Sequence, residues 1–152
     1  MKKDELAVLT KKDWIIGFDD LNPRQLAAEI ARRKGGMFYQ LENGTYLLGK
    51  DYGEYFVPGC HKIPWPEQYP EEYFFDTDSF PDWANNSSAA IQLGAEMKNA
   101  HGDPHVLGLE TDANGRKRWK AYFRKSCVYA WGDTPAEAMC RAYLLAYEIH
   151  NP

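Results

Sequence analysis

Two histidines and a carboxylate stand close enough in the chain to suggest metal chemistry. His101-Gly-Asp-Pro-His105 places them within five residues, as in a transition-metal site. Gly102 and Pro104 interrupt any helix there, so the two imidazoles cannot share one helical face, and no HExxH or CxxC pattern occurs in the chain. We therefore expect a helix-ending turn and no metal site.

Two further groups combine residue types that catalysis uses. Cys60 and His61 are adjacent, but neighbouring side chains of an extended segment point apart, whereas activation of a thiol requires contact with the base. Asp76, Asp78 and Asp82 would suit magnesium or acid–base work, yet no phosphate-cradling glycine loop accompanies them. We expect a solvated acidic loop, no catalytic residue and no cofactor.

A basic stretch near residue 120 stands out in a chain with a formal net charge of -4. In the strand expected over Arg118–Phe123, apolar side chains that face a core alternate with polar ones that face outward. Guanidinium groups grip phosphates bidentately, and aromatic rings stack on bases. A charge-protected edge strand is the structural alternative. The predicted ligand site consists of Arg116, Arg118, Lys120, Tyr122 and Arg124.

Residues 51–81 hold five prolines among many aromatic and acidic side chains. Proline neither donates to a sheet nor continues a helix, so this composition predicts a long irregular loop. Its aromatics form either a lid on a sheet, the interpretation favoured for Phe74 and Phe75, or an interaction surface. The predicted partner-binding residues are Trp65, Tyr69 and Trp83.

Length and composition exclude several classes of protein. The 152 residues fit a single domain, 1–152, and the acidic balance argues against general nucleic-acid binding. Three cysteines without metal-ligand spacing suit a reducing cytoplasm. The apolar run at the N-terminus is too short for a signal peptide, and no membrane-spanning stretch follows. We expect a cytoplasmic protein.

Capping and turn signals divide the domain into four segments. Residues 1–36 carry two capping patterns, at Thr10–Asp13 and Asn22–Gln25, which predict a pair of helices. Asn43-Gly44 predicts a type I′ hairpin within residues 37–50, and the loop fills residues 51–81. The last segment, residues 82–152, predicts a helix capped by Ser87, strands over His105–Glu110, Arg118–Phe123 and Cys127–Trp131, and a closing helix that begins with the capping box Thr134-Pro-Ala-Glu137.

The stretch from Phe80 to Glu148 resembles the phage ABA sandwich domain family, small proteins of tailed bacteriophages and prophages. Ser87-Ser-Ala-Ala-Ile carries part of the likeness. The rest lies in the closing helix, where the family pattern is matched by Thr134, Pro135, Ala138, Cys140, Arg141 and Ala142. The resemblance implies an α+β fold, a three-layer α/β/α sandwich with helices on both faces of a mainly antiparallel sheet. It offers no established active site to transfer.

Taken with the basic strand, the resemblance implies a phage-encoded, non-catalytic accessory protein that acts by binding in the host bacterial cytoplasm. Such an anti-defence protein would sequester a nucleotide signal or occlude a host protein, and it would be a homo-oligomer. The alternative is a small enzyme that processes a nucleotide or phosphodiester with Asp76, Asp78 or Asp82.

Overall fold

The computed structural model describes residues 18–53 and 58–152. The capping pattern at Thr10–Asp13, which predicts the first N-terminal helix, lies outside these residues. Within them the α+β class is confirmed, with two sheets and three α-helices. The chain divides into two compact units, one of residues up to Leu26 together with Trp83–Pro152, and one of Ala27–Asp82. The single domain expected from the chain length stays a prediction.

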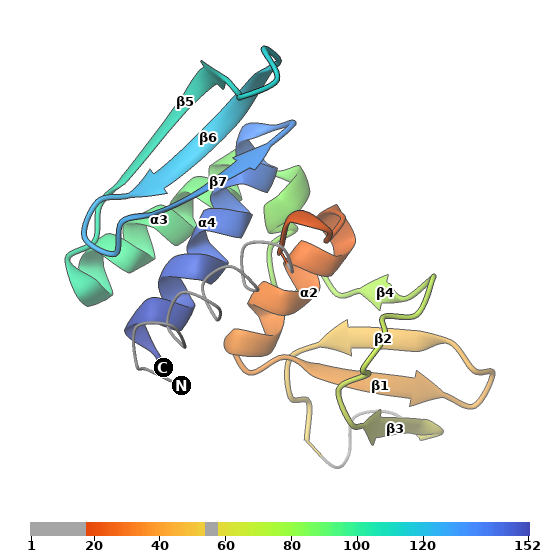
Figure 1. The fold of residues 1–152 in the computed structure, drawn as a ribbon. Coiled ribbons are helices and arrows are strands. Elements are labelled where there is room, and N and C mark those ends of the chain that lie inside the picture. The colour runs from red at the N-terminus through yellow and green to blue at the C-terminus, as the bar shows by residue number, and fades with distance from the viewer. Residues whose placement is uncertain (1–17, 54–57) are drawn as a thin grey trace, which may run out of the picture. The chain divides into compact units, whose positions relative to one another are not determined.

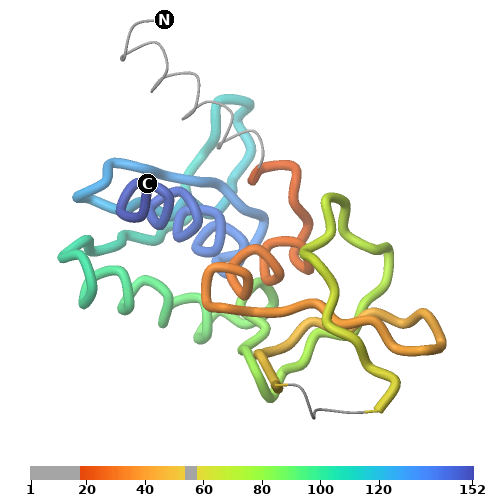
Figure 2. The backbone as a smooth tube through the Cα atoms, turned by 90° about the horizontal axis from the view of Figure 1, so that it is seen from below, coloured from red at the N-terminus to blue at the C-terminus, as the bar shows by residue number. Residues whose placement is uncertain are grey.

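The larger unit consists of an antiparallel sheet and two long helices. Its strands follow one another in the order β5-β6-β7. Helices α3 and α4 lie on the same face of this sheet (Figure 1) and run side by side (Figure 2). The bounds are η1 Trp83–Asn85, α3 Ser87–His101, β5 His105–Thr111, β6 Lys117–Phe123, β7 Val128–Gly132 and α4 Pro135–His150.

The core of the larger unit lies between the sheet and the two helices. Alternate residues of β6 point into it, and Ala121 and Phe123 are 0% exposed. Met139 and Leu144 of α4 are equally buried. The predicted alternation of β6 is thus confirmed. No helix among the described residues is long and apolar enough to cross a membrane.

Helices cover only one face of this sheet within residues 18–53 and 58–152. On the other face, Val106 of β5 and Tyr129 of β7 are 42% and 49% exposed. The second helical layer of the expected three-layer sandwich is therefore not confirmed. We call this surface the open face and define it by Val106, Gly108, Glu110, Arg118, Lys120, Tyr122, Tyr129 and Trp131.

Side chains that accept backbone hydrogen bonds set the starts of the two helices. The predicted cap of α4 is confirmed, because the Thr134 hydroxyl accepts the Glu137 N–H at 3.1 Å. Helix α3 differs from the prediction: its N-cap is Asn86, whose side-chain oxygen Oδ1 accepts the Ala89 N–H at 3.1 Å. Asn86 was missed because the following serine is an equally good capping residue in sequence.

Helix α2, Pro23–Arg33, begins as its sequence predicts. The Asn22 and Gln25 side chains exchange hydrogen bonds with each other's backbone N–H at 2.9 and 3.0 Å, a complete capping box. Glu29 and Arg33 pair one turn apart at 3.0 Å. The helix ends before Gly35, whose φ of +85° lies in the left-handed region.

The smaller unit contains a four-stranded sheet in the order β3-β1-β2-β4. The irregular loop predicted over residues 51–81 is therefore wrong in part, since it supplies both edge strands. These strands are short, and the prolines stand beside them rather than within them, as Pro64 directly follows β3. The bounds are β1 Met37–Leu41, β2 Tyr46–Gly49, β3 Cys60–Ile63 and β4 Phe74–Phe75.

The β1–β2 hairpin forms where predicted but with another turn. A type I′ turn requires positive φ at both central residues, and here only Gly44 has it, at +86°. Gly44 N–H donates to the Leu41 carbonyl and Leu41 N–H to the Thr45 carbonyl, both at 2.9 Å. This is a type I turn followed by a glycine bulge. The Asn43 side chain accepts the Thr45 N–H at 2.9 Å.

Candidate functional site

The middle of the predicted ligand site lies on the open face. Arg118, Lys120 and Tyr122 alternate with the buried residues of β6, so their side chains stand on the uncovered side of the sheet. The register with β7 places Trp131 opposite Lys120 and Tyr129 opposite Tyr122. The structure therefore adds two aromatic rings that the sequence did not assign to the site.

The ammonium group of Lys120 lies over both of these rings. Its Nζ is 4.5 Å from the ring centroid of Tyr129 and 5.3 Å from that of Trp131. Both distances are within the range of cation–π attraction. The strand pairing thus gathers one positive charge and two stacking surfaces at one place on the open face.

Arg116 and Arg118, which lie near the turn between β5 and β6, share the carboxylate of Asp133. Arg116 donates to Asp133 Oδ1 at 3.0 Å, and Nε of Arg118 lies 3.4 Å from the same oxygen. That Nε atom is buried and makes no hydrogen bond among the described residues. Asp133 therefore offsets part of the positive charge that the sequence predicts for an anion.

The outer members of the predicted site lie in turns. Arg116 precedes β6 and Arg124 follows it, so the seven residues of the extended strand separate them, by about 27 Å. The predicted residues therefore form a row along a strand and do not close around a pocket. Only Arg118, Lys120 and Tyr122 stand with the rings of the open face.

Trp65 and Tyr69, which were predicted to bind a partner, are both partly buried. Trp65 packs edge-on against Phe38 at 4.7 Å between ring centroids, with the Arg32 guanidinium 5.4 Å from its ring. Its indole N–H donates to the Tyr69 hydroxyl at 3.3 Å. Burial, then the nearby carboxylate of Glu29, raises the pKa of Tyr69. These rings belong to an aromatic cluster of the smaller unit that consists of Phe38, Trp65, Tyr69 and Tyr73.

The third residue predicted for the partner surface, Trp83, is a core residue of the larger unit. Only 3% of it is exposed, in the short helix η1 that precedes α3. Its neighbour Ala84 is equally buried, at 2%. Of the aromatics predicted to form the lid, Phe74 is 63% exposed and Phe75 is half-buried.

The carboxylates proposed for the alternative enzyme hold their own loop together. Asp76 accepts the Asp78 N–H at 3.0 Å and the Ser79 hydroxyl at 2.7 Å. No group of three or more potential metal ligands gathers within residues 18–53 and 58–152. Cys60 and His61 are neighbours in strand β3, where successive side chains point to opposite faces. Burial raises the pKa of the Cys60 thiol.

The two histidines of the 101–105 motif separate in the fold. His105 packs near Phe123, and burial lowers its pKa. His101 stacks on His150, with ring centroids 4.3 Å apart and planes at 3°. His150 Nε2 lies 2.8 Å from Oδ2 of Asp103, which is fully buried. No local signal could have found this contact, because His150 follows Asp103 by 47 positions.

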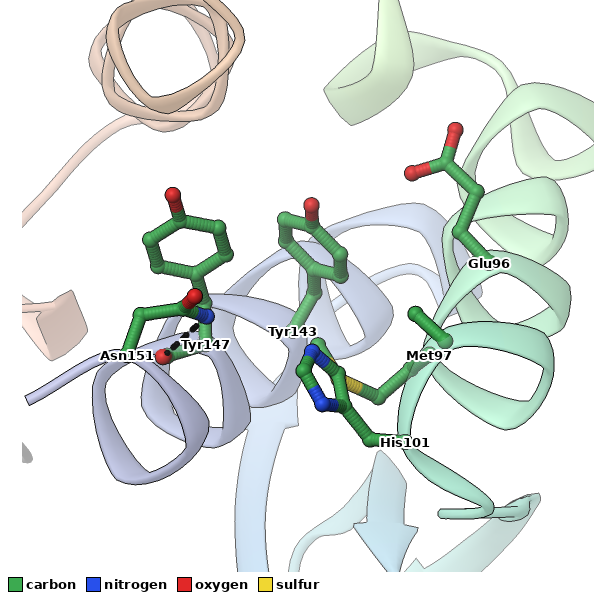
Figure 3. Close-up of a pocket in the computed structure, with 7 residues that line it drawn as sticks. Glu96, Met97, His101, Tyr143, Tyr147 and Asn151 are labelled. Carbon is green, nitrogen blue, oxygen red and sulfur yellow. Dashed lines mark hydrogen bonds between the residues drawn. The ribbon is translucent and has the colours of Figure 1, made fainter.

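A shallow pocket of about 150 Å³ lies between α3 and α4 beside this stack (Figure 3). Tyr143 and Tyr147 line it from α4, and Glu96, Met97 and His101 line it from α3 (Figure 3). Glu96 supplies the only formal charge among its lining residues, so the pocket is a poor place for an anion. The lining residues are Glu96, Met97, Ala100, His101, Tyr143, Tyr147 and Asn151.

The Asp103 side chain connects α4 to the turn after β6 by hydrogen bonds. Its carboxylate accepts the Lys125 N–H at 2.7 Å and the Ser126 N–H at 3.3 Å, besides the contact with His150. Burial by itself would raise the pKa of Asp103, but the hydrogen bonds from His150 and from this turn outweigh it and lower the pKa. The carboxylate is therefore held as an anion in the folded protein.

We expect Asp103→Asn to lower the free energy of unfolding by about 2 kcal/mol at neutral pH, because the amide presents one acceptor oxygen in place of two. A lowered folded pKa contributes stability above the unfolded pKa, about 3.9, and that contribution disappears as the pH falls through the folded pKa. Urea unfolding at pH 7 and pH 3 should show the difference between wild type and variant shrinking in acid. An equal difference at both values contradicts the ionised role.

Comparison with known proteins adds no relative. No protein-family model matches the chain, and no curated protein or solved structure shows significant similarity to it. The resemblance to the phage ABA sandwich family therefore rests on the motifs between Phe80 and Glu148.

Proposed function

We propose that the protein binds a small anionic ligand that carries a stacking ring, such as a nucleotide, on the open face. One observation carries the proposal: the Lys120 ammonium lies over the rings of Tyr129 and Trp131 on a sheet face that helices of the described residues leave uncovered. Aromatic rings offer a stacking surface to any base, and a lysine at their centre attracts phosphate.

Charge on the open face favours a small ligand over a nucleic-acid strand. Arg118 shares Asp133 with Arg116, and the strand register places Glu110 opposite Arg118. Lys120 is therefore the cation with the least acidic surroundings on this face. A polymer would require a longer run of unpaired cations to neutralise its phosphates.

The same residues favour binding over catalysis. The open face carries neither a histidine nor a cysteine, so it offers no general base poised near neutral pH and no thiol nucleophile. Asp76, on which the alternative enzyme depends, is engaged by Asp78 and Ser79 in its own loop. Sequestration of the ligand is the activity that these groups support.

The biological role in the proposal comes from the family resemblance. We infer a phage-encoded accessory protein that counters host defence by capturing a nucleotide signal. A complete three-layer sandwich would place helices over the open face and hide Lys120, so this part of the resemblance competes with the ligand proposal. Occlusion of a host protein is less well supported, because Trp83 is a core residue and Trp65 packs on Phe38.

Titration calorimetry with cyclic and linear nucleotides tests the proposal. We expect Lys120→Ala and Tyr129→Ala each to weaken binding about tenfold or more, since stacking contributes about 1–3 kcal/mol per base. Lys98→Ala is the matched control, as Lys98 is an exposed lysine of α3 away from the open face. Absence of heat with every nucleotide would rule the proposal out. Recovery of intact ligand after denaturation separates sequestration from catalysis.

A further inference from the structure

The outer edge of β5 has unpaired backbone groups. One hydrogen bond continues the β5–β6 pairing beyond each end of β5. The Arg124 N–H donates to the Pro104 carbonyl at 3.0 Å, and the Asp112 N–H donates to the Arg116 carbonyl at 2.8 Å. Antiparallel pairs alternate between bonded and non-bonded, so Val106, Gly108 and Glu110 are the β5 residues that bond to β6. The backbone groups of His105, Leu107, Leu109 and Thr111 therefore point outward.

Nothing among the described residues pairs with this edge. β5 lies at one end of the sheet order, and its outward backbone groups make no hydrogen bond within residues 18–53 and 58–152. The opposite edge differs, because Arg141 donates to the Trp131 carbonyl of β7 at 2.9 Å. An open strand edge is a template for another strand.

Strand β5 also lacks several of the devices that proteins use to block such pairing. It contains no lysine and no proline, and its register with β6 is continuous without a bulge. Its side chains remain accessible on both faces of the sheet, with Val106 42% and Leu109 54% exposed. A paired strand would therefore bury apolar surface on each side of the new ladder.

We propose that β5 pairs with β5 of a second copy, antiparallel about a two-fold axis at Gly108. Complete overlap of His105–Thr111 with itself requires the axis at the central residue, and Gly108 is that residue. Leu107 then lies opposite Leu109 of the other copy. Both residues direct their backbone groups outward, so this pair exchanges both of its hydrogen bonds.

The side chains around this axis are complementary to themselves. On the helix side of the sheet, Leu107 of each copy lies opposite Leu109 of the other copy, so the two-fold axis creates two identical apolar pairs. On the open face, Val106 lies opposite Glu110, so the two copies bring no like charges together. Gly108 meets Gly108 without side chains, and an added Cβ there would have no atom within 4 Å in one copy. This self-complementarity favours a second copy of the chain over a foreign strand as the partner.

Sedimentation equilibrium or light scattering measures the association directly. We expect the wild type to be a dimer and Leu109→Lys to weaken the dimer at least about tenfold, because the charge would lie against Leu107 of the other copy. Ile91→Lys is the matched control, since Ile91 is an apolar residue of α3 with 42% exposure. A monomeric wild type, an open-ended assembly, or equal weakening by both variants overturns the proposal.

Disulfide trapping tests the position of the axis. In a Cys127→Ser background, which removes the exposed thiol, Gly108→Cys should cross-link two copies on oxidation. Non-bonded antiparallel partners are about 4.5 Å apart at Cα, within the range of about 4.4–6.8 Å that disulfides span. Val106→Cys, on the same face, should not cross-link because its counterpart lies four residues along the strand. Cross-linking of Val106→Cys without Gly108→Cys overturns this register.

The dimer and the ligand site are tested separately. Pairing through β5 would join the two open faces into one continuous surface, while Lys120, Tyr129 and Trp131 remain on β6 and β7. Leu109→Lys should therefore dissociate the dimer and leave the fold intact, as judged by circular dichroism. Loss of nucleotide binding in Lys120→Ala would not change the mass of the assembly.

Discussion

Replacing Arg141 by Met should lower the free energy of unfolding by about 3–5 kcal/mol, the largest effect we expect from a single substitution. Arg141 is 7% exposed, and its guanidinium donates to the carbonyls of Trp131, Leu21 and Phe18 at 2.9, 3.0 and 3.1 Å. Methionine fills a similar volume but leaves three carbonyls without their donor. Urea unfolding followed by circular dichroism measures the loss.

Arg116→Met is the matched control for this result. Arg116 also forms an ion pair, with Asp133 at 3.0 Å, but both side chains are more than half exposed. Exposed pairs contribute about 0–1 kcal/mol, so we expect little change. Arg141→Lys should fall between the two variants, because an ammonium group keeps the charge but lacks the planar fork that reaches three acceptors. Equal effects of Arg116→Met and Arg141→Met would contradict the bridging role.

The role of Arg141 also explains why the closing helix carries an arginine at this position. Sequence alone placed this residue in a motif of the closing helix and gave no reason for an arginine there. In the fold it connects α4 to the end of β7 and to the segment before α2. Its partners precede it by 123 and 120 positions, a separation that no local pattern can reveal.

Local signals predicted the elements whose ends depend on nearby residues. The capping boxes at Asn22 and Thr134 and the alternation of β6 need only contacts within a few positions, and all three are confirmed. The start of β7 shows the limit of this reasoning. Cys127 was expected to open the strand, but its φ of +58° places it in the left-handed region, so β7 begins at Val128.

Strands β3 and β4 were missed for a different reason. They form because β1 and β2 offer unpaired edges, so their structure comes from pairing partners rather than from their own sequence. The four residues of β3 show no buried alternation, since His61 and Lys62 are both exposed. Periodicity cannot identify a strand of this length without knowledge of its neighbour.

Sequence alone predicted the β6 residues of the candidate site but not its β7 residues. Alternation along one strand put Arg118, Lys120 and Tyr122 on one face, and burial in the fold agrees. The rings that complete the site come from β7, and only the register of the β6–β7 hairpin brings Trp131 opposite Lys120. Because a shift of one residue would turn both rings toward the helices, this part of the site depends on the geometry of the connection.

The junction between β7 and α4 is the place of the second large effect, which we expect from Gly132→Ala. A Cβ at Gly132 would lie 2.4 Å from the Ala138 backbone nitrogen and 2.9 Å from Glu137 Cβ, so the first turn of α4 would have to move from the end of β7. Backbone atoms cannot move aside as a side chain can, so we expect the free energy of unfolding, measured with urea, to fall by about 3 kcal/mol.

Gly108→Ala, with no atom within 4 Å of its added Cβ, is the control and should change the free energy of unfolding by less than about 0.5 kcal/mol at low protein concentration. Similar losses in the two variants would mean that strand propensity, and not the approach of α4, decides the effect.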